Sequence, residues 1–174
     1  DEKTQYAISG NYSDQKGIVI NSDFKRYSIR LNLDRKIFKN FSVGTHMTAS
    51  HTISNSVATD TGGEDGTISG ALRMNPIQPV YEDELTGAYT QINVHGILVP
   101  NPVATAKERK FNNATSRLLG DIYAQWEIIP DLKLKVSLGA DVMYHKTNRY
   151  TPSNIYQSGG VASAYVGVNK SINW

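Results

Sequence analysis

Charged side chains recur at alternate positions along several segments of this 174-residue chain. Asp121 and Asp141 lie in two neighbouring segments of this kind, so they are candidates for one shared polar face. Two carboxylates on one face can serve as an acid–base pair, as in a glycoside-processing enzyme. Without a pocket or a displaced pKa, the general polarity of such a face explains the pair better. We therefore expect no catalytic role.

The histidines and acidic residues are not spaced to bind a metal. His46 and His51 lie five positions apart in one strand pattern, which places them on opposite faces, and His95 and His145 stand alone. The stretch 60–66 has three carboxylates among glycines, but its spacing fits no EF-hand, and a solvated loop is favoured over a calcium site. The chain has no cysteine, no nucleophile elbow and no phosphate loop, and we expect no cofactor.

The elements that would position these side chains are β-strands. Apolar and polar residues alternate most clearly in 117–128 and 132–145, which are separated only by Ile129, Pro130 and Asp131. The same pattern recurs in 4–13, 24–35, 42–53 and 165–174. We expect six antiparallel strands joined as hairpins, with short and long connections in alternation. This would gather the long loops, including a very long one over 55–113, at one end of the sheet.

Two local features of the long loop can be predicted. Residues 67–74 fit a short helix that Asp65 or Thr67 would cap and that Pro76 would prevent from continuing. The run Pro100-Asn101-Pro102 indicates extended or turn structure.

Alternation alone does not say whether the apolar face meets lipid or a second sheet. The first alternative is a soluble β-sandwich, for example a carbohydrate-binding module. Three observations favour a transmembrane β-barrel. The strands are long, aromatic residues stand near the strand ends on the apolar face, and the apolar positions of the four clearest strands carry no charge while their other face carries several. The charged positions of that other face are Arg26, Arg30, Asp34, Arg117, Asp121, Glu127, Lys133, Lys135 and Asp141.

Size and charge limit the assembly further. Six strands would close too tightly to hold nine charged groups with their water, so the chain would be an arc of a larger barrel. The strand patterns at both ends of the sequence agree with an excerpt of this kind. The formal net charge of +2, without a basic run interleaved with aromatics, gives no reason to expect nucleic-acid binding.

Several blocks of the sequence, in order, resemble one family. Residues 6–19 (YAISGNYSDQKGIV) and 21–34 (NSDFKRYSIRLNLD) are similar to the early barrel of SusC-like (SusC/RagA) TonB-dependent transporters. The resemblance continues through 79–84 (PVYEDE), 101–104 (NPVA), 117–123 (RLLGDIY) and 132–135 (LKLK). It spans nearly the whole chain, and the ordered set is more specific than any single block.

The resemblance implies a function and partners for the whole protein. Such proteins import large nutrients, oligosaccharides or peptides, across the bacterial outer membrane. They have a barrel of roughly twenty-two strands, an N-terminal plug, a TonB-contacting segment and a SusD-like surface lipoprotein. This chain lacks the plug and the TonB-contacting segment and would contribute six strands. The expected lumen-lining residues are Arg30, Asp34, Arg117, Asp121 and Asp141, and Tyr81 and Tyr89 of the loop over 55–113 are expected to contact substrate or partner.

Overall fold

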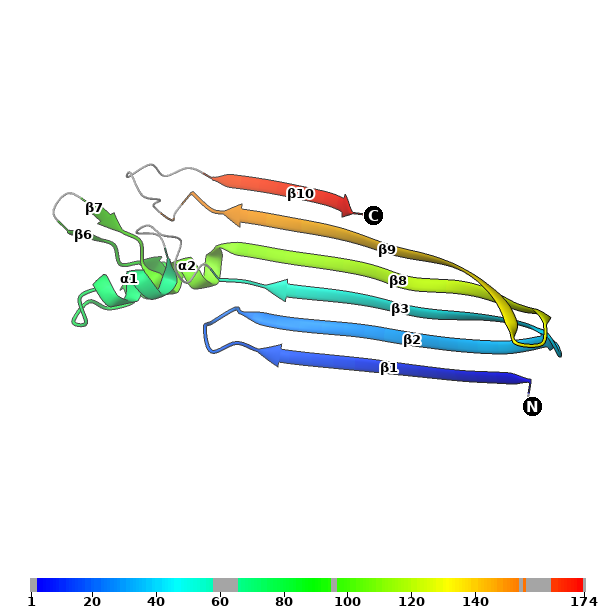
Figure 1. Cartoon of the computed structure of the whole chain (residues 1–174). Coiled ribbons are helices and arrows are strands. Elements are labelled where there is room, and N and C mark those ends of the chain that lie inside the picture. Colours follow the sequence, from blue (N-terminus) through cyan, green and yellow to red (C-terminus); the bar gives the residue numbers. More distant parts are fainter. Residues whose placement is uncertain (1–2, 58–65, 95–96, 154, 156–163, 174) are drawn as a thin grey trace.

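The computed structural model describes residues 3–57, 66–94, 97–153, 155 and 164–173, and its main element is one antiparallel sheet. The strand order β1-β2-β3-β8-β9-β10 follows the chain, so each strand pairs with its neighbour in sequence (Figure 1). The six strands that the alternation predicts are therefore confirmed. Their bounds are β1 Thr4–Lys16, β2 Asp23–Phe38, β3 Phe41–Asn55, β8 Lys110–Ile129, β9 Leu132–Thr151 and β10 Tyr165–Asn173.

Short and long connections lie at opposite ends of the sheet (Figure 1). Two-residue turns join β2 to β3 at Lys39-Asn40 and β8 to β9 at Pro130-Asp131. Asp131 has φ 68°, a left-handed conformation that aspartate tolerates better than most residues. The three longer connections gather at the other end, as the sequence predicts.

The strands run further toward the long loops than alternation indicates. β8 begins at Lys110 rather than near Arg117, and β9 continues to Thr151. The added residues, for example Asn112, Asn113 and Thr115, are polar on both faces, so no alternation marks them. The connection between β3 and β8 is correspondingly 56–109, shorter than the predicted 55–113.

The described part of this long connection has its own secondary structure. It contains α1 (Thr67–Arg73), the hairpin of β4 (Tyr81–Asp83) with β5 (Ala88–Tyr89), the pair β6 (Ile92–Val94) with β7 (Ile97–Val99), and α2 (Pro102–Glu108). The first helix confirms the prediction. Its cap differs, because Gly66 occupies the N-cap position without a side-chain hydrogen bond, so Thr67 is not the cap. Asp65, like residues 60–64 of the suggested calcium stretch, lies outside the described residues.

Asn101 has the extended backbone that the sequence predicts for 100–102, but Pro102 already belongs to helix α2, which the sequence analysis did not predict. Asn101 is the N-cap, and its Oδ1 accepts hydrogen bonds from the backbone N–H groups of Val103 and Ala104. Pro102 occupies the first helical turn, where its missing N–H costs nothing.

The buried side chains belong to the loops and not to the sheet. Among the described residues, the buried apolar positions are Val99, Ala104, Ala106 and Ile155, and the buried polar ones are Thr67, Thr90, Asn101 and Thr105. Apolar residues of the strands stay uncovered, with Tyr6 74% and Leu138 68% exposed. Neither helix in the described residues has the length and apolarity that a membrane span requires.

Candidate functional site

The two faces of the sheet carry different side chains. Residues paired across neighbouring strands share a face, so the pairing shows which side chains lie together. One face, which we call the apolar face, holds rows such as Ile8–Leu31–Met47 and Ile29–Ala49–Leu118–Val142. Toward the loops these rows end in an aromatic row, and toward the tight turns they end in the row Phe41–Trp126–Leu134. The aromatic row consists of Tyr12, Tyr27, His51, Ser116 and Tyr144.

The opposite, polar face carries all five predicted lumen residues. Arg30 and Asp34 lie on β2, Arg117 and Asp121 on β8, and Asp141 on β9. Four of them fall into two groups of contacts, described next, which the sequence does not reveal, and Arg30 lines a hollow beside these groups.

The first group surrounds a histidine that the sequence analysis did not select. His46 on β3 places Nδ1 3.4 Å from Oδ2 of Asp121 and Nε2 3.7 Å from Oδ2 of Asp34. Its ring stacks on Tyr123 with centroids 5.9 Å apart, and Lys135 Nζ lies 4.3 Å from the centre of the Tyr123 ring. We call these five residues the His46 cluster.

A glycine makes room for this cluster. The Tyr123 hydroxyl donates a hydrogen bond of 2.5 Å to Oδ1 of Asp34, across the intervening strand β3. Gly44 is the residue of β3 directly between them, opposite Asp34 on one side and Tyr123 on the other. A Cβ at this position would stand 2.4 Å from Asp34 Oδ1 and 2.4 Å from Tyr123 Cε1. Only glycine therefore lets the tyrosine cross the strand as it does.

The second group is the ion pair of Arg117 with Asp141. Arg117 Nε donates to Oδ1 at 2.8 Å and Nη2 donates to Oδ2 at 2.5 Å, which is the two-point geometry of strong arginine–carboxylate pairs. The two residues are diagonal neighbours on β8 and β9, and both side chains remain about half exposed. The pair therefore lies in water and organises the surface more than it stabilises the fold.

A hollow of about 530 Å³ on the polar face brings the two groups together. Arg30, His46, Asp121 and Asp141 all line it, with Gly139 and Leu119 between them. Three of the five predicted residues thus border one hollow, while Asp34 and Arg117 lie beside it and contact its members. Asp121 and Asp141 contact different side chains, His46 and Arg117, and so they do not form a matched acid–base pair.

His51 and His145 do not converge on a site. His51 lies on the apolar face, where Nδ1 is 2.9 Å from Ser116 Oγ, so the prediction of opposite faces for His46 and His51 is confirmed. His145 lies between the hydroxyls of Thr115 at 2.8 Å and Thr147 at 3.0 Å. Within the described residues no group of histidine, aspartate and glutamate side chains is arranged to hold a metal ion. His95 lies outside them.

The two loop tyrosines contact each other. The Tyr81 and Tyr89 rings lie 5.1 Å apart and tilted, on paired strands β4 and β5, and Lys107 Nζ donates to the Tyr81 hydroxyl at 3.3 Å. Burial, with the nearby charge of Glu108, raises the pKa of Tyr89 above its ordinary value. Both rings therefore take part in packing the loop, whatever they contact from outside.

Asn101 holds this loop together. It is 3% exposed, and in addition to capping α2 its amide nitrogen donates to the carbonyls of Val80 at 2.9 Å and Thr90 at 3.0 Å. One side chain thus connects α2 with the segments that flank the β4–β5 hairpin. Asn21 of the β1–β2 connection reaches the other end of α2, where it donates to the carbonyls of Ala106 and Lys107 at 3.2 Å.

Comparison with known proteins agrees with this geometry. The chain is 34% identical over 164 residues to TonB-dependent receptor P3 of Formosa agariphila, a match that covers 92% of this chain and 16% of that protein. It is 31% identical over 158 residues to TonB-dependent receptor SusC of Bacteroides thetaiotaomicron, covering 78% of this chain and 15% of that protein. No family model matches the chain.

The fold matches solved transporter structures. The RagAB peptide importer in its open-open state superposes with a TM-score of 0.67 at 25% identity, over 91% of this chain and 18% of the other. The sheet is therefore a segment of an antiparallel transmembrane-type β-barrel. The chain spans about one sixth of the length of the curated relatives it matches. With the sequence relatives and the fold in agreement, the chain belongs to the SusC-like TonB-dependent receptors.

Proposed function

We propose that this chain is a wall segment of a TonB-dependent transporter in the bacterial outer membrane. The whole protein would import large nutrients, oligosaccharides or peptides, together with a SusD-like surface lipoprotein. A peptide importer among the structural matches supports the peptide alternative, and a SusC receptor among the relatives supports the family's partner arrangement. The plug and the TonB-contacting segment would belong to parts of the protein beyond this segment.

The observation that carries the proposal is the height of the uncovered apolar face. On β9, Leu134 belongs to the row Phe41–Trp126–Leu134 near the tight turns, and Tyr144 belongs to the aromatic row near the loops. The two residues are ten positions apart, about 33 Å along a strand. At the strand tilt of about 40° usual in barrels, this corresponds to about 25 Å, the height of the apolar band of outer-membrane barrels. The strands extend beyond the band at the loop end, where a polar rim would stand clear of the bilayer.

The polar face would line the lumen. The charges of Arg117 and Asp141 balance each other, and Asp34 and Asp121 both lie close to His46. Such a wall offers hydrogen bonds to hydrophilic solutes and to a plug without trapping either strongly, because exposed ion pairs exchange readily with water.

The loop over 56–109 would lie outside the cell and face the lipoprotein. Several of its apolar side chains are uncovered, with Leu72 and Ile77 each 83% and Leu85 98% exposed. These side chains are suited to contact with a partner protein. Tyr81 and Tyr89 would take part in the same surface, each ring offering an apolar face with a polar tip.

Cysteine labelling in intact cells tests the orientation. We call the whole transporter that contains this segment the parent protein. The segment has no cysteine, so Leu85→Cys on the loop and Lys39→Cys in a tight turn each give a single reporter once the rest of the parent protein is free of cysteine. We expect a membrane-impermeant maleimide to label Leu85→Cys in intact cells and Lys39→Cys only after the outer membrane is permeabilised. The reverse pattern would overturn the orientation. A parent protein that is soluble without detergent would overturn the membrane assignment in favour of the soluble β-sandwich.

A second test separates transport from catalysis. Deletion of the parent gene should abolish growth on the imported oligosaccharide or peptide, while Asp121→Asn and Asp141→Asn should retain at least partial uptake. A hydrolytic activity of the purified parent protein that disappears in either variant would favour an enzyme instead.

A further inference from the structure

A row of lysines follows the aromatic row on the apolar face, one step closer to the loops. The paired residues of this row are Asp14, Lys25, Ile53, Ala114, Lys146 and Lys170. Lys25 forms an ion pair with Asp14, with Nζ 3.6 Å from Oδ2. Within the part of the chain that the structure describes, neither Lys146 nor Lys170 has a carboxylate at ion-pair distance.

Lys146 and Lys170 are direct partners on neighbouring strands β9 and β10. Like charges placed directly opposite each other in an antiparallel pair destabilise the sheet. An anion between the two ammonium groups would remove this repulsion and gain two charge-assisted hydrogen bonds. The pair therefore has the charge of an anion site on two directly paired residues.

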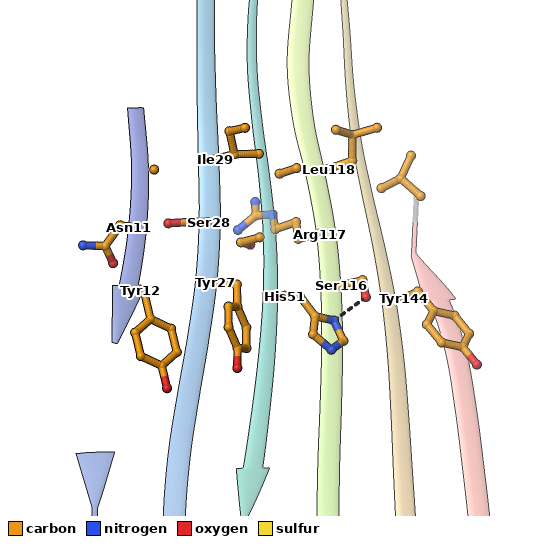
Figure 2. A pocket seen from close by; sticks show the side chains of 14 residues that line it. Asn11, Tyr12, Tyr27, Ser28, Ile29, His51, Ser116, Arg117, Leu118 and Tyr144 are labelled. Carbon is orange, nitrogen blue, oxygen red and sulfur yellow. Dashed lines mark hydrogen bonds between the residues drawn. The ribbon is translucent and has the colours of Figure 1, made fainter. Parts of the chain in front are cut away.

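An apolar groove adjoins this pair on the same face. It has a volume of about 900 Å³ and runs along the aromatic row, where Leu118, Val142 and Tyr144 line the part closest to Lys146. Figure 2 shows Tyr12 and Tyr27 side by side, with His51, Ser116 and Tyr144 continuing the row across the strands. Side chains such as Ile29 and Leu118, which lie above the row in Figure 2, form the apolar floor of the groove on the side of the tight turns.

We propose that Lys146 and Lys170 bind the phosphate of an anionic lipid, one acyl chain of which lies in the groove beside Tyr144 and Val142. The inference rests on the proposed function, because it requires this face to meet the bilayer. It adds to that function a specific lipid site in the leaflet nearest the long loops.

The order of the chemistry along the strands supports a lipid rather than a free anion. From the loops toward the turns, β9 presents Lys146, Tyr144, Val142 and Ala140 on this face, and β10 presents Lys170 and then Ile172. A phosphate, a polar–apolar boundary and an acyl chain occur in the same order in a membrane lipid. A free phosphate would use only the lysines.

Native mass spectrometry of the full-length parent protein in a neutral detergent tests the proposal. The probes are dipalmitoyl phosphatidylglycerol, dipalmitoyl phosphatidylcholine and inorganic phosphate. We expect tighter binding of phosphatidylglycerol than of phosphatidylcholine, and a loss of about tenfold or more in the Lys146→Gln/Lys170→Gln double variant. This preference should decline with added salt, as the attraction between exposed charges is screened.

Lys16→Gln/Lys25→Gln is the matched control, because it removes the same charge from the same face. Lys16 is paired across the sheet with Asp23, and Lys25 with Asp14, so both already face a carboxylate. The control should bind phosphatidylglycerol as the wild type does. Equal loss in both double variants, unchanged binding in the test variant, or competition of inorganic phosphate at the same concentration as lipid would each overturn the proposal.

Failure of this site is distinguishable from failure of the proposed function. A parent protein that inserts in membranes and imports nutrient, but binds both lipids equally, contradicts only the lipid site. A parent protein that remains soluble without detergent contradicts both.

Discussion

Tyr123 on β8 and Asp34 on β2 are joined by a hydrogen bond that passes over a glycine of the strand between them. The bond links strands that are not neighbours, and it brings Asp34 within reach of His46 on the same side. Its existence depends on the absence of a side chain at Gly44, because a Cβ there would meet both partners.

Gly44→Ala should therefore displace Tyr123 from Asp34. We expect a loss of about 1–3 kcal/mol in the free energy of unfolding, the usual cost of adding a methyl group to an occupied space. Denaturant unfolding of the parent protein in detergent, followed by tryptophan fluorescence, measures this change.

Gly139→Ala is the matched control for this substitution. Gly139 is also on the polar face of the sheet, but the nearest atom to an added Cβ there is the Gly120 carbonyl oxygen at 3.7 Å. The free energy of unfolding of this control should lie within about 0.5 kcal/mol of the wild-type value. Equal destabilisation by both substitutions would contradict the role of Gly44.

The sequence predicts the faces of this sheet well because period two depends only on local geometry. It does not predict which residues on a face touch. His46 shares its face with Asp34 and Asp121, and the alternation contains that information. The His46 cluster forms because β8 pairs with β3, and alternation does not predict this pairing across a connection of more than fifty residues.

The partners of Arg117 and the helix α2 were missed for different reasons. Arg117 and Asp141 are diagonal neighbours, and their register is set by the turn at Pro130-Asp131 and by the irregularity at Glu127–Ile129, which alternation does not reveal. In contrast, Asn101-Pro102 is a recognisable helix start, an N-cap followed by proline in the first turn. Prolines on both sides of Asn101 also fit an interruption of regular structure, so the two signals compete at this position.

The ion pair of Arg117 with Asp141 should contribute little to stability. A double-mutant cycle with Arg117→Gln and Asp141→Asn is expected to give a coupling free energy of about 0.5–1 kcal/mol, because two-point geometry helps but both side chains are about half exposed. Denaturant unfolding of the four proteins measures it. Arg30 lines the hollow of the polar face together with Asp141, and Arg30→Gln is the control. Its coupling free energy with Asp141→Asn is expected to be near zero. A coupling above about 2 kcal/mol would mean that the pair is shielded from water in the whole barrel.

Asn101→Ala should loosen the long loop without unfolding the sheet. The substitution removes the cap of α2 and leaves the carbonyls of Val80 and Thr90 without their donor, so we expect a local cost of about 2–4 kcal/mol. Hydrogen–deuterium exchange should speed up across 80–108 and stay unchanged in β8 and β9. Asn75→Ala is the control, because among the described residues its side chain accepts one hydrogen bond, from the exposed backbone N–H of Ile77 at 3.2 Å. Equal effects of both variants would contradict the central role of Asn101.

The turn between β4 and β5 should loosen in acid. The backbone N–H of Leu85, at 2.8 Å, and the Thr86 hydroxyl, at 3.0 Å, hold the pKa of the Asp83 carboxyl below its ordinary value. A lowered pKa in the folded state means that the carboxylate stabilises the turn fully above the ordinary pKa of 3.8 and that this stabilisation is lost as the pH falls through the lower, folded value. Hydrogen–deuterium exchange of 81–89, corrected for the intrinsic effect of pH, should therefore stay slow down to about pH 4 and accelerate below it.

Two variants make this pH dependence specific to Asp83. Asp83→Asn keeps an oxygen that can accept from Leu85 but cannot titrate, so its exchange should show no acid transition. Glu82→Gln removes a neighbouring charge and should retain the transition of the wild type, because no hydrogen bond from the turn depends on it among the described residues. An acid transition that persists in Asp83→Asn would assign the effect to another group in the loop.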